Sequence, residues 1–112
     1  MDEISFDDFL KVDMRVGTIL SAEPNVKARK PAYVLTIDFG PEYGIRTTSA
    51  QITEAHRLED LPGCQVLAVM NFPPKRVAGV KSEVLTLATL EESGRAVLIT
   101  PSQAVPNGTR LL

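Results

Sequence analysis

Apolar and polar side chains alternate with a period of two along several short stretches of this chain, a pattern that predicts β-strands. The alternation is clearest over 33–39, where Tyr33, Leu35, Ile37 and Phe39 share one face. Further strands are predicted over 14–23, 45–51, 64–72, 82–90 and 95–100. Because 64–72 is apolar on both faces, we expect it to be the most deeply buried strand.

Apolar residues follow helical spacing in two places. Ser5, with Asp8 three residues further on, predicts the capped start of a short helix. The apolar face of this helix consists of Phe6, Phe9 and Leu10. A helix of this length is not stable alone, so its apolar face must pack either on its own domain or on a partner subunit. A second short helix is predicted over 53–61.

Glycine and proline residues separate these elements. Gly17 lies inside the first strand and predicts a bulge or sharp bend there. Pro106-Asn107-Gly108 predicts a turn near the C-terminus. Several short strands, glycine bends and one intervening helix predict an all-β fold, a five-stranded Greek-key barrel of the OB type, in one domain spanning 1–112. Barrels of this type bind single-stranded nucleic acid and other extended ligands on one face, but the fold does not fix the function.

The stretch 69–85 has the features of a recognition edge. An apolar run ending in Asn71 and Phe72 is stopped by two prolines, and Lys75, Arg76 and Lys81 follow with no acid among them. A rigid corner and a basic loop between two strands would present these cations to a ligand. The alternative is an ordinary hairpin whose loop is basic by chance.

Two more segments carry cations or polar side chains suited to the same face. The loop 25–31 contains Lys27, Arg29 and Lys30 and no acid. It is either a solvated loop or a second arm of the basic patch. The strand 45–51 is polar and includes Arg46 and Ser49, so it is either a sheet edge or a surface that meets a polar ligand.

Composition limits the classes of protein that this chain can represent. Its 112 residues, 44% hydrophobic and 23% charged, suit one globular domain, and its net charge of -2 means that nucleic acid could bind only at a local basic patch. The single Cys64 excludes an internal disulfide and suits a reducing compartment. The chain shows neither a membrane-length apolar run nor a basic signal sequence, so we expect a cytoplasmic protein that does not insert into membranes.

Residues suited to catalysis are scarce. We expect the only histidine, His56, to lie on the surface and Cys64 to be a small core residue. The adjacent acidic pairs, 7–8 and 91–92, are poor acid–base partners because neighbouring side chains point apart. Neither a phosphate-binding loop nor a metal-ligand cluster is evident. We therefore expect a binding protein and not an enzyme, with no metal and no cofactor.

Four motifs in order resemble the tRNA-binding OB-fold family. They are D-M-R-V-G-T-I at 13–19, S-A-Q-I at 49–52, N-F-P-P-K-R-V-A-G-V-K-S-E-V-L at 71–85 and P-N-G-T at 106–109. This family includes the C-terminal appendage of bacterial methionyl-tRNA synthetases and free-standing homodimeric tRNA-binding proteins. Within it, the N-F-P-P-K-R and S-E-V-L segments resemble the CsaA-type chaperones, which are linked to protein secretion.

The resemblance implies a barrel with extra terminal elements that form a two-fold dimer. It implies either a cytoplasmic chaperone for unfolded or export-bound polypeptides, or a tRNA-binding protein that uses the same face. Where tRNA binders of the family have S-E-G-M, this chain has Ser82-Glu83-Val84-Leu85. Valine in place of glycine blocks close backbone approach and adds apolar surface, which suits a peptide. We expect Val84 to face the ligand groove and Leu85 to pack inside.

These inferences define two sets of candidate residues. The candidate peptide- or RNA-binding residues are Arg29, Lys30, Arg46, Ser49, Asn71, Phe72, Lys75, Arg76, Lys81, Ser82 and Val84. The candidate dimer-interface residues are Phe6, Phe9, Leu10 and Leu111. Net negative charge and few aromatic residues favour the polypeptide ligand, whereas the local concentration of cations favours RNA.

Overall fold

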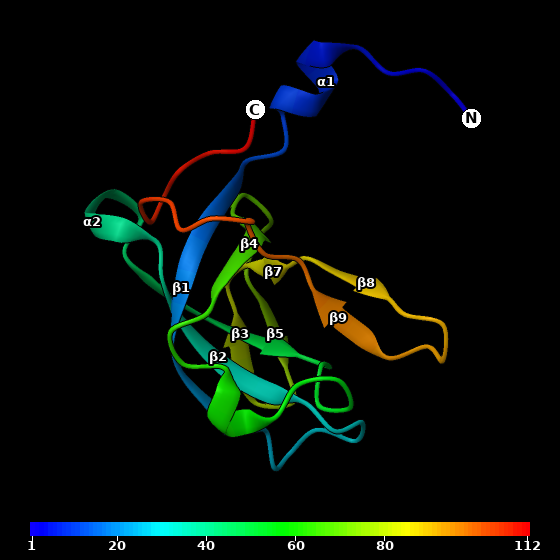
Figure 1. The fold of residues 1–112 in the computed structure, drawn as a ribbon, viewed down its shortest axis with the longest axis vertical. Coiled ribbons are helices and arrows are strands. Elements are labelled where there is room, and N and C mark those ends of the chain that lie inside the picture. Colours follow the sequence, from blue (N-terminus) through cyan, green and yellow to red (C-terminus); the bar gives the residue numbers. More distant parts are fainter.

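Five antiparallel strands form the central sheet of the computed structural model, which describes residues 1–112. In the order β3-β2-β1-β4-β7, the strands are β3 (Ile45–Ala50), β2 (Tyr33–Asp38), β1 (Met14–Pro24), β4 (Gln65–Val69) and β7 (Leu85–Thr86). The sheet curls so that the backbone N–H of Glu83, just before β7, donates to the carbonyl of Thr47 in β3 at 2.9 Å. The predicted five-stranded all-β barrel is therefore confirmed (Figure 1).

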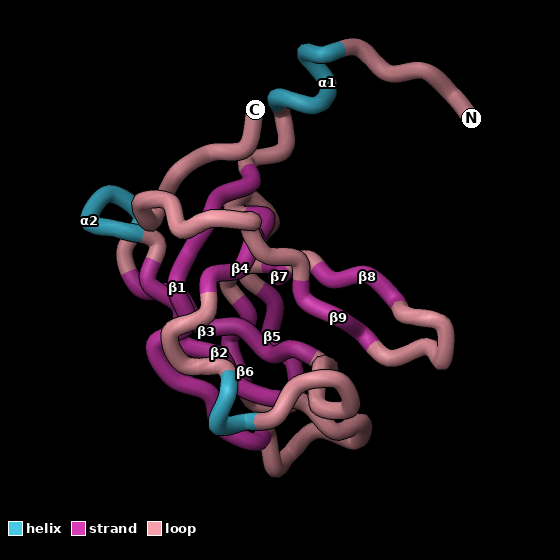
Figure 2. Tube along the Cα trace, in the orientation of Figure 1, coloured by secondary structure: helices cyan, strands magenta, loops and turns pink.

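The remaining helices and hairpins are additions to this five-stranded barrel (Figure 2). They are α1 (Phe6–Leu10), α2 (Gly40–Tyr43), the 3₁₀ helix η1 (Leu58–Asp60), and two separate hairpins, β5 (Lys75–Val77) with β6 (Val80–Ser82) and β8 (Ala88–Leu90) with β9 (Ala96–Leu98). The β8–β9 hairpin projects from the barrel (Figure 1). None of the helices is long and apolar enough to cross a membrane.

The core lies inside the barrel and follows the predicted alternation in β2. Leu35 and Ile37 of β2, and Phe39 directly after it, are completely buried, as expected for the inward face of the predicted strand. In β4, Val66 and Ala68 are also completely buried, in agreement with the predicted depth of this strand. The strand period thus places the apolar side chains correctly wherever two long strands pair in register.

Gly17 does not mark the bulge that was predicted there. The register of β1 against β2 shifts between Ile19 and Ser21, and leaves Leu20 47% exposed. Gly17 is instead buried against β2, where a Cβ would lie 2.6 Å from Cγ2 of Ile37. The glycine is therefore needed for close packing and not for a bend.

The N-terminal helix forms as predicted. The Ser5 hydroxyl accepts a hydrogen bond from the backbone of Asp8, and the Asp8 carboxylate accepts one from the backbone of Ser5, which completes a capping box. No residue of α1 is buried, and the helix stands away from the barrel (Figure 1). The barrel therefore leaves the apolar face of the helix largely uncovered, and packing on a partner subunit stays a prediction.

The predicted strand over 82–90 is interrupted. Glu83 bonds to β3, whereas Leu85 and Thr86 pair with Val69 and Ala68 of β4. The chain therefore changes its pairing partner from β3 to β4 within three residues, so 82–90 cannot form one continuous hydrogen-bonded strand. The prediction failed because the pairing partner of a strand is decided by residues that are far away in the sequence.

The predicted helix over 53–61 is a turn followed by η1, and two nearby residues also differ from expectation. Cys64 is exposed, with its thiol donating to the Asp60 carbonyl, because β4 begins only at Gln65. His56 is half-buried, and its Nε2 accepts a hydrogen bond from the Leu98 backbone N–H at 3.1 Å. The histidine thus joins the 53–61 segment to β9.

Candidate functional site

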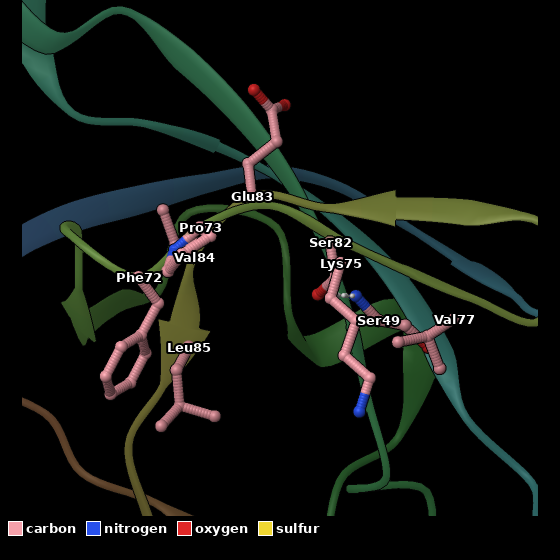
Figure 3. A pocket seen from close by; sticks show the side chains of 9 residues that line it. All are labelled: Ser49, Phe72, Pro73, Lys75, Val77, Ser82, Glu83, Val84 and Leu85. Carbon is pink, nitrogen blue, oxygen red and sulfur yellow. Dashed lines mark hydrogen bonds between the residues drawn. The ribbon is translucent and has the colours of Figure 1, made fainter.

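A pocket of about 370 Å³ opens beside the seam between β3 and the β5–β6 hairpin. Phe72 and Leu85 lie on one side of it and Lys75 and Val77 on the other, as Figure 3 shows. The remaining lining residues are Ser49, Pro73, Ser82, Glu83 and Val84. The pocket therefore combines apolar side chains with one ammonium group. Its lining residues come from several segments between positions 49 and 85.

The β5–β6 hairpin gives this site its rigid edge. Pro73 and Pro74 end the preceding segment, and Ala78 and Gly79, at φ 47° and 82°, form a two-residue turn. Lys75, Arg76 and Lys81 lie on the two strands and not in the loop where they were predicted. Because successive strand residues point to opposite faces, Lys75 and Val77 line the pocket whereas Arg76 does not.

The loop 25–31 reaches the tip of this hairpin. A Cβ placed on Gly79 would lie 3.0 Å from Cδ and 3.4 Å from Nζ of Lys27. Asn25 anchors the loop to β3, since its Nδ2 donates to the Ser49 hydroxyl at 3.4 Å. Lys27 and the hairpin thus form one basic surface, while Arg29 and Lys30 are exposed on the same loop and do not line the pocket.

Ser82 and Glu83 close the barrel seam at the back of the pocket. The Ser82 hydroxyl lies 2.8 Å from the Thr48 hydroxyl and accepts the Ser49 backbone N–H at 3.4 Å. The Glu83 carboxylate accepts the Thr47 backbone N–H at 3.0 Å. This Ser-Glu pair therefore builds the site as well as lining it.

Val84 and Leu85 have the opposite orientations to those predicted. Val84 is only 5% exposed and belongs to the core cluster, although it also forms part of the pocket floor, whereas Leu85 is 50% exposed. The Val84 carbonyl accepts the hydroxyl of buried Thr48, which turns this residue inward. The apolar wall of the pocket is provided by Leu85 together with Phe72.

Two other candidate residues are engaged in local structure. Asn71 accepts the Asp13 backbone N–H at 2.9 Å and donates to the Lys11 carbonyl at 2.7 Å. The Arg46 guanidinium donates to the Tyr43 carbonyl, and alternation along β3 puts Arg46 and Ser49 on opposite faces. Neither Asn71 nor Arg46 lines the pocket.

The terminal candidates lie together at another end of the molecule. Phe6 is 67% and Leu10 40% exposed, and the rings of Phe6 and half-buried Phe9 are 6.0 Å apart. Leu111 is half-buried and its backbone N–H donates to the Met14 carbonyl. The helix and the C-terminal tail are joined by Arg110, which donates to the Leu10 carbonyl at 2.7 Å.

The chain's cations are unevenly partnered. Of the twelve Lys and Arg residues, five form ion pairs with carboxylates, namely Lys11, Arg15, Arg57, Arg95 and Arg110. The other seven are Lys27, Arg29, Lys30, Arg46, Lys75, Arg76 and Lys81, and all lie in the segments assigned to the basic patch. The structure has no group of three or more His, Cys, Asp or Glu side chains placed to hold a metal ion.

Sequence reasoning missed part of the pocket lining. Pro73, Val77, Glu83 and Leu85 were not among the candidates, although Val77 could have been found from its i, i+2 relation to Lys75 on one strand face. No local signal marks Leu85, because its exposure depends on where the chain leaves β6 to join β4.

The chain matches known proteins along nearly its whole length. The profile of the putative tRNA binding domain matches residues 14–110. Methionine–tRNA ligase from Archaeoglobus fulgidus is 41% identical over 98% of this chain, and that from Methanococcoides burtonii is 39% identical over 96%. This chain spans only 16% of either ligase. The profile that this chain matches is that of a putative tRNA binding domain and not of a catalytic domain.

Solved structures resemble the whole chain. The crystal structure of chaperone CsaA from Bacillus anthracis str. Ames superposes with a TM-score of 0.91 at 51% identity, covering 99% of this chain and 100% of that one. CsaA from Picrophilus torridus gives 0.90 at 40%, covering 98% and 100%. The methionyl-tRNA-synthetase-related protein from Pyrococcus horikoshii gives 0.87 at 32%, covering 100% of both chains. With the barrel, the four motifs and these matches in agreement, the chain belongs to the tRNA-binding domain family, as a protein of the CsaA type.

Proposed function

We propose that this protein is a cytoplasmic chaperone that holds unfolded or export-bound polypeptide segments in the pocket between Phe72 and Lys75. The observation that carries the proposal is the pocket wall, where Phe72 and Leu85 remain 53% and 50% exposed above buried Val84. Large apolar side chains exposed at a concave site are typical of ligand-binding grooves. The two similar structures described as chaperone CsaA support the same function.

The proposal is tested by changing the apolar wall. Leu85→Ser should weaken binding of a permanently unfolded, fluorescein-labelled polypeptide by about fivefold, because a half-exposed leucine offers roughly 1 kcal/mol of further burial. Ile45→Ser is the matched control, since Ile45 is 60% exposed on β3 but does not line the pocket. Fluorescence anisotropy gives both affinities, and an unchanged affinity for Leu85→Ser would exclude this groove.

A second candidate function is tRNA binding on the same face. It is favoured by the seven cations that lack an ion pair and by the match to the tRNA-binding domain profile. A salt titration separates the two functions, because affinity for tRNA falls steeply with log salt concentration. Polypeptide binding through the apolar wall should change little. Polypeptide affinity that falls as steeply as tRNA affinity would put RNA binding first.

We also propose that the protein is a homodimer formed through its termini. α1 buries none of its own residues, and Phe6 and Leu10 are left uncovered beside the C-terminal tail. A two-fold partner would bury this face. Light scattering at micromolar concentration should then give twice 12.2 kDa, and Phe6→Ser with Phe9→Ser should give the single mass. A monomeric wild-type protein would rule the dimer out.

A further inference from the structure

We propose that the pocket selects polypeptide segments in which an apolar residue is flanked by acidic residues, and discriminates against segments with basic flanks. This inference rests on the proposed function and specifies the charge of the ligand. It draws on three features of the site, namely the cations without partners, their convergence on the hairpin, and the position of the one carboxylate near the pocket.

The lack of ion pairs on this face is not caused by a shortage of acids. The chain has 14 Asp and Glu residues against 12 Lys and Arg, yet every ion pair uses a cation from outside the basic patch. The acids of the N-terminal segment, Asp7 and Asp8, lie in α1, which stands away from the barrel (Figure 1). The positive charge of the patch is therefore left for an external partner.

Cations from two segments converge where the hairpin turns. Lys27 from the 25–31 loop lies over Gly79, and the Arg76 guanidinium donates to the Gly79 carbonyl at 3.1 Å. Lys81 lies directly opposite Arg76 in the β5–β6 register. Like charges held this close are unfavourable without a counter-charge, so an anionic group bound here would relieve their repulsion.

The pocket itself offers one ammonium and no open carboxylate. Lys75 lies on the side facing Phe72 and Leu85, and Figure 3 shows Glu83 pointing away from all three. Glu83 also accepts the Thr47 backbone N–H, which keeps its carboxylate at the seam. A basic side chain next to the bound apolar residue would therefore meet the like charge of Lys75, while the one carboxylate nearby is turned away and held at the seam.

The spacing of an extended chain fits this arrangement. Residues next to an apolar anchor lie about 3.3 Å further along an extended segment for each position, so they reach the rim while the anchor stays against Phe72 and Leu85. Carboxylates at these positions would contact Lys75 at the pocket and would lie in the positive field of Arg76 and Lys81, which project from the other face of the same hairpin. The apolar anchor supplies the contact that a polyanion lacks, which is why we assign this ligand to the polypeptide class.

The test uses three fluorescein-labelled peptides with the same central Leu-Phe-Leu and with Glu-Ser-Glu, Gln-Ser-Gln or Lys-Ser-Lys on each side. At low salt we expect the acidic peptide to bind about tenfold tighter than the neutral one, and the basic peptide more weakly, since each exposed charge pair contributes a few-fold. The double substitution Lys75→Gln with Arg76→Gln should remove most of the difference in affinity between the three peptides. Arg57→Gln with Arg95→Gln, which removes two cations outside the patch, should preserve it.

The outcomes separate this inference from the function on which it rests. Equal binding of all three peptides would overturn the charge preference and leave the chaperone proposal intact, whereas no binding of any peptide would overturn both. A fourth peptide keeps the acidic flanks and replaces the centre with Ser-Ser-Ser. If it binds as tightly as the acidic apolar peptide and tRNA displaces it, the face is a polyanion site, and the inference is wrong.

Discussion

Gly17 lies where the β1 backbone passes closest to the side chains of β2. A Cβ at this position would be 2.6 Å from Cγ2 of Ile37 and 2.7 Å from the ring of Phe39, and both of these side chains are completely buried. Close-packed cores cannot move aside for an added methyl group without strain. The absence of a side chain at Gly17 is what allows the barrel to close tightly here.

We therefore expect Gly17→Ala to lower the free energy of unfolding by about 1–3 kcal/mol, as measured by urea denaturation. Gly63→Ala is the comparator, because a Cβ there meets nothing within 4 Å and the substitution carries only the strain of a φ of 91°. That strain costs about 1 kcal/mol. If the two variants lost the same stability, crowding at Gly17 would not be the cause.

His56 links stability to pH. Burial lowers the pKa of His56 below its ordinary value of 6.5, and its Nε2 accepts the Leu98 backbone N–H. Below pH 6.5 the unfolded chain takes up a proton that the folded chain does not, so the free energy of unfolding falls as pH falls through that value. The loss continues until the folded-state pKa is passed.

Thermal unfolding should therefore show a decrease in stability, dependent on this side chain, as pH falls from neutral through 6.5. His56→Gln is the test variant, because the glutamine does not titrate and His56 is the only histidine. It should be less sensitive to pH over this interval than the wild type. Identical pH profiles would mean that His56 has the same pKa in both states.

Among the larger elements, the seam between β3 and β6 depends on side chains. The Ser82 hydroxyl binds both the Thr48 hydroxyl and the Ser49 backbone N–H, where an ordinary strand pair would use its backbone groups. Ser82→Ala should reduce the free energy of unfolding by about 1–3 kcal/mol, because it leaves the buried Thr48 hydroxyl with fewer partners. Ser102→Ala, at an exposed position in the tail, should change it little. Urea denaturation of both variants distinguishes a structural seam from a surface contact.

The C-terminal tail lies outside the barrel and is bound to β1 by hydrogen bonds, an arrangement that we call the clasp. It follows β1, where the Gly108 backbone N–H donates to Val16 and the Val16 N–H donates to Thr109. Arg15 extends this clasp by donating to the Gly108 carbonyl at 2.9 Å, and its guanidinium lies 4.0 Å from the Tyr43 ring centre. The tail thus pairs with the backbone of β1 around Val16, a residue that is only 3% exposed.

Asn107 is the central side chain of this clasp. Its Oδ1 accepts the Thr18 hydroxyl at 2.7 Å and the Gln65 amide at 3.2 Å, which joins the tail to two strands. Asn107→Ala should lower the free energy of unfolding by about 1–3 kcal/mol. Gln103→Ala removes an exposed amide from the same tail and is the matched control. Equal denaturation curves for the two variants would show that the tail does not support the barrel.

Features that depend on neighbouring residues were predictable from the sequence. The period of two over 33–39 determines which side chains of β2 face inward, because successive strand residues point to opposite faces. The Ser5 cap and the turn after Pro106 also depend on hydrogen bonds within a few residues. The same local patterns placed the cations of 75–81 on one hairpin after a proline corner.

Features that depend on distant partners required the folded chain. The sequence pattern is compatible with either Val84 or Leu85 pointing inward. The hydrogen bond from Thr48 to Val84 and the pairing of Leu85 with Val69 decide that Val84 is the buried one. The contact of Lys27 with Gly79 likewise joins segments that are far apart in sequence. Alternation says that two neighbours differ, but burial depends on which strand lies opposite, and that is set by closure of the barrel.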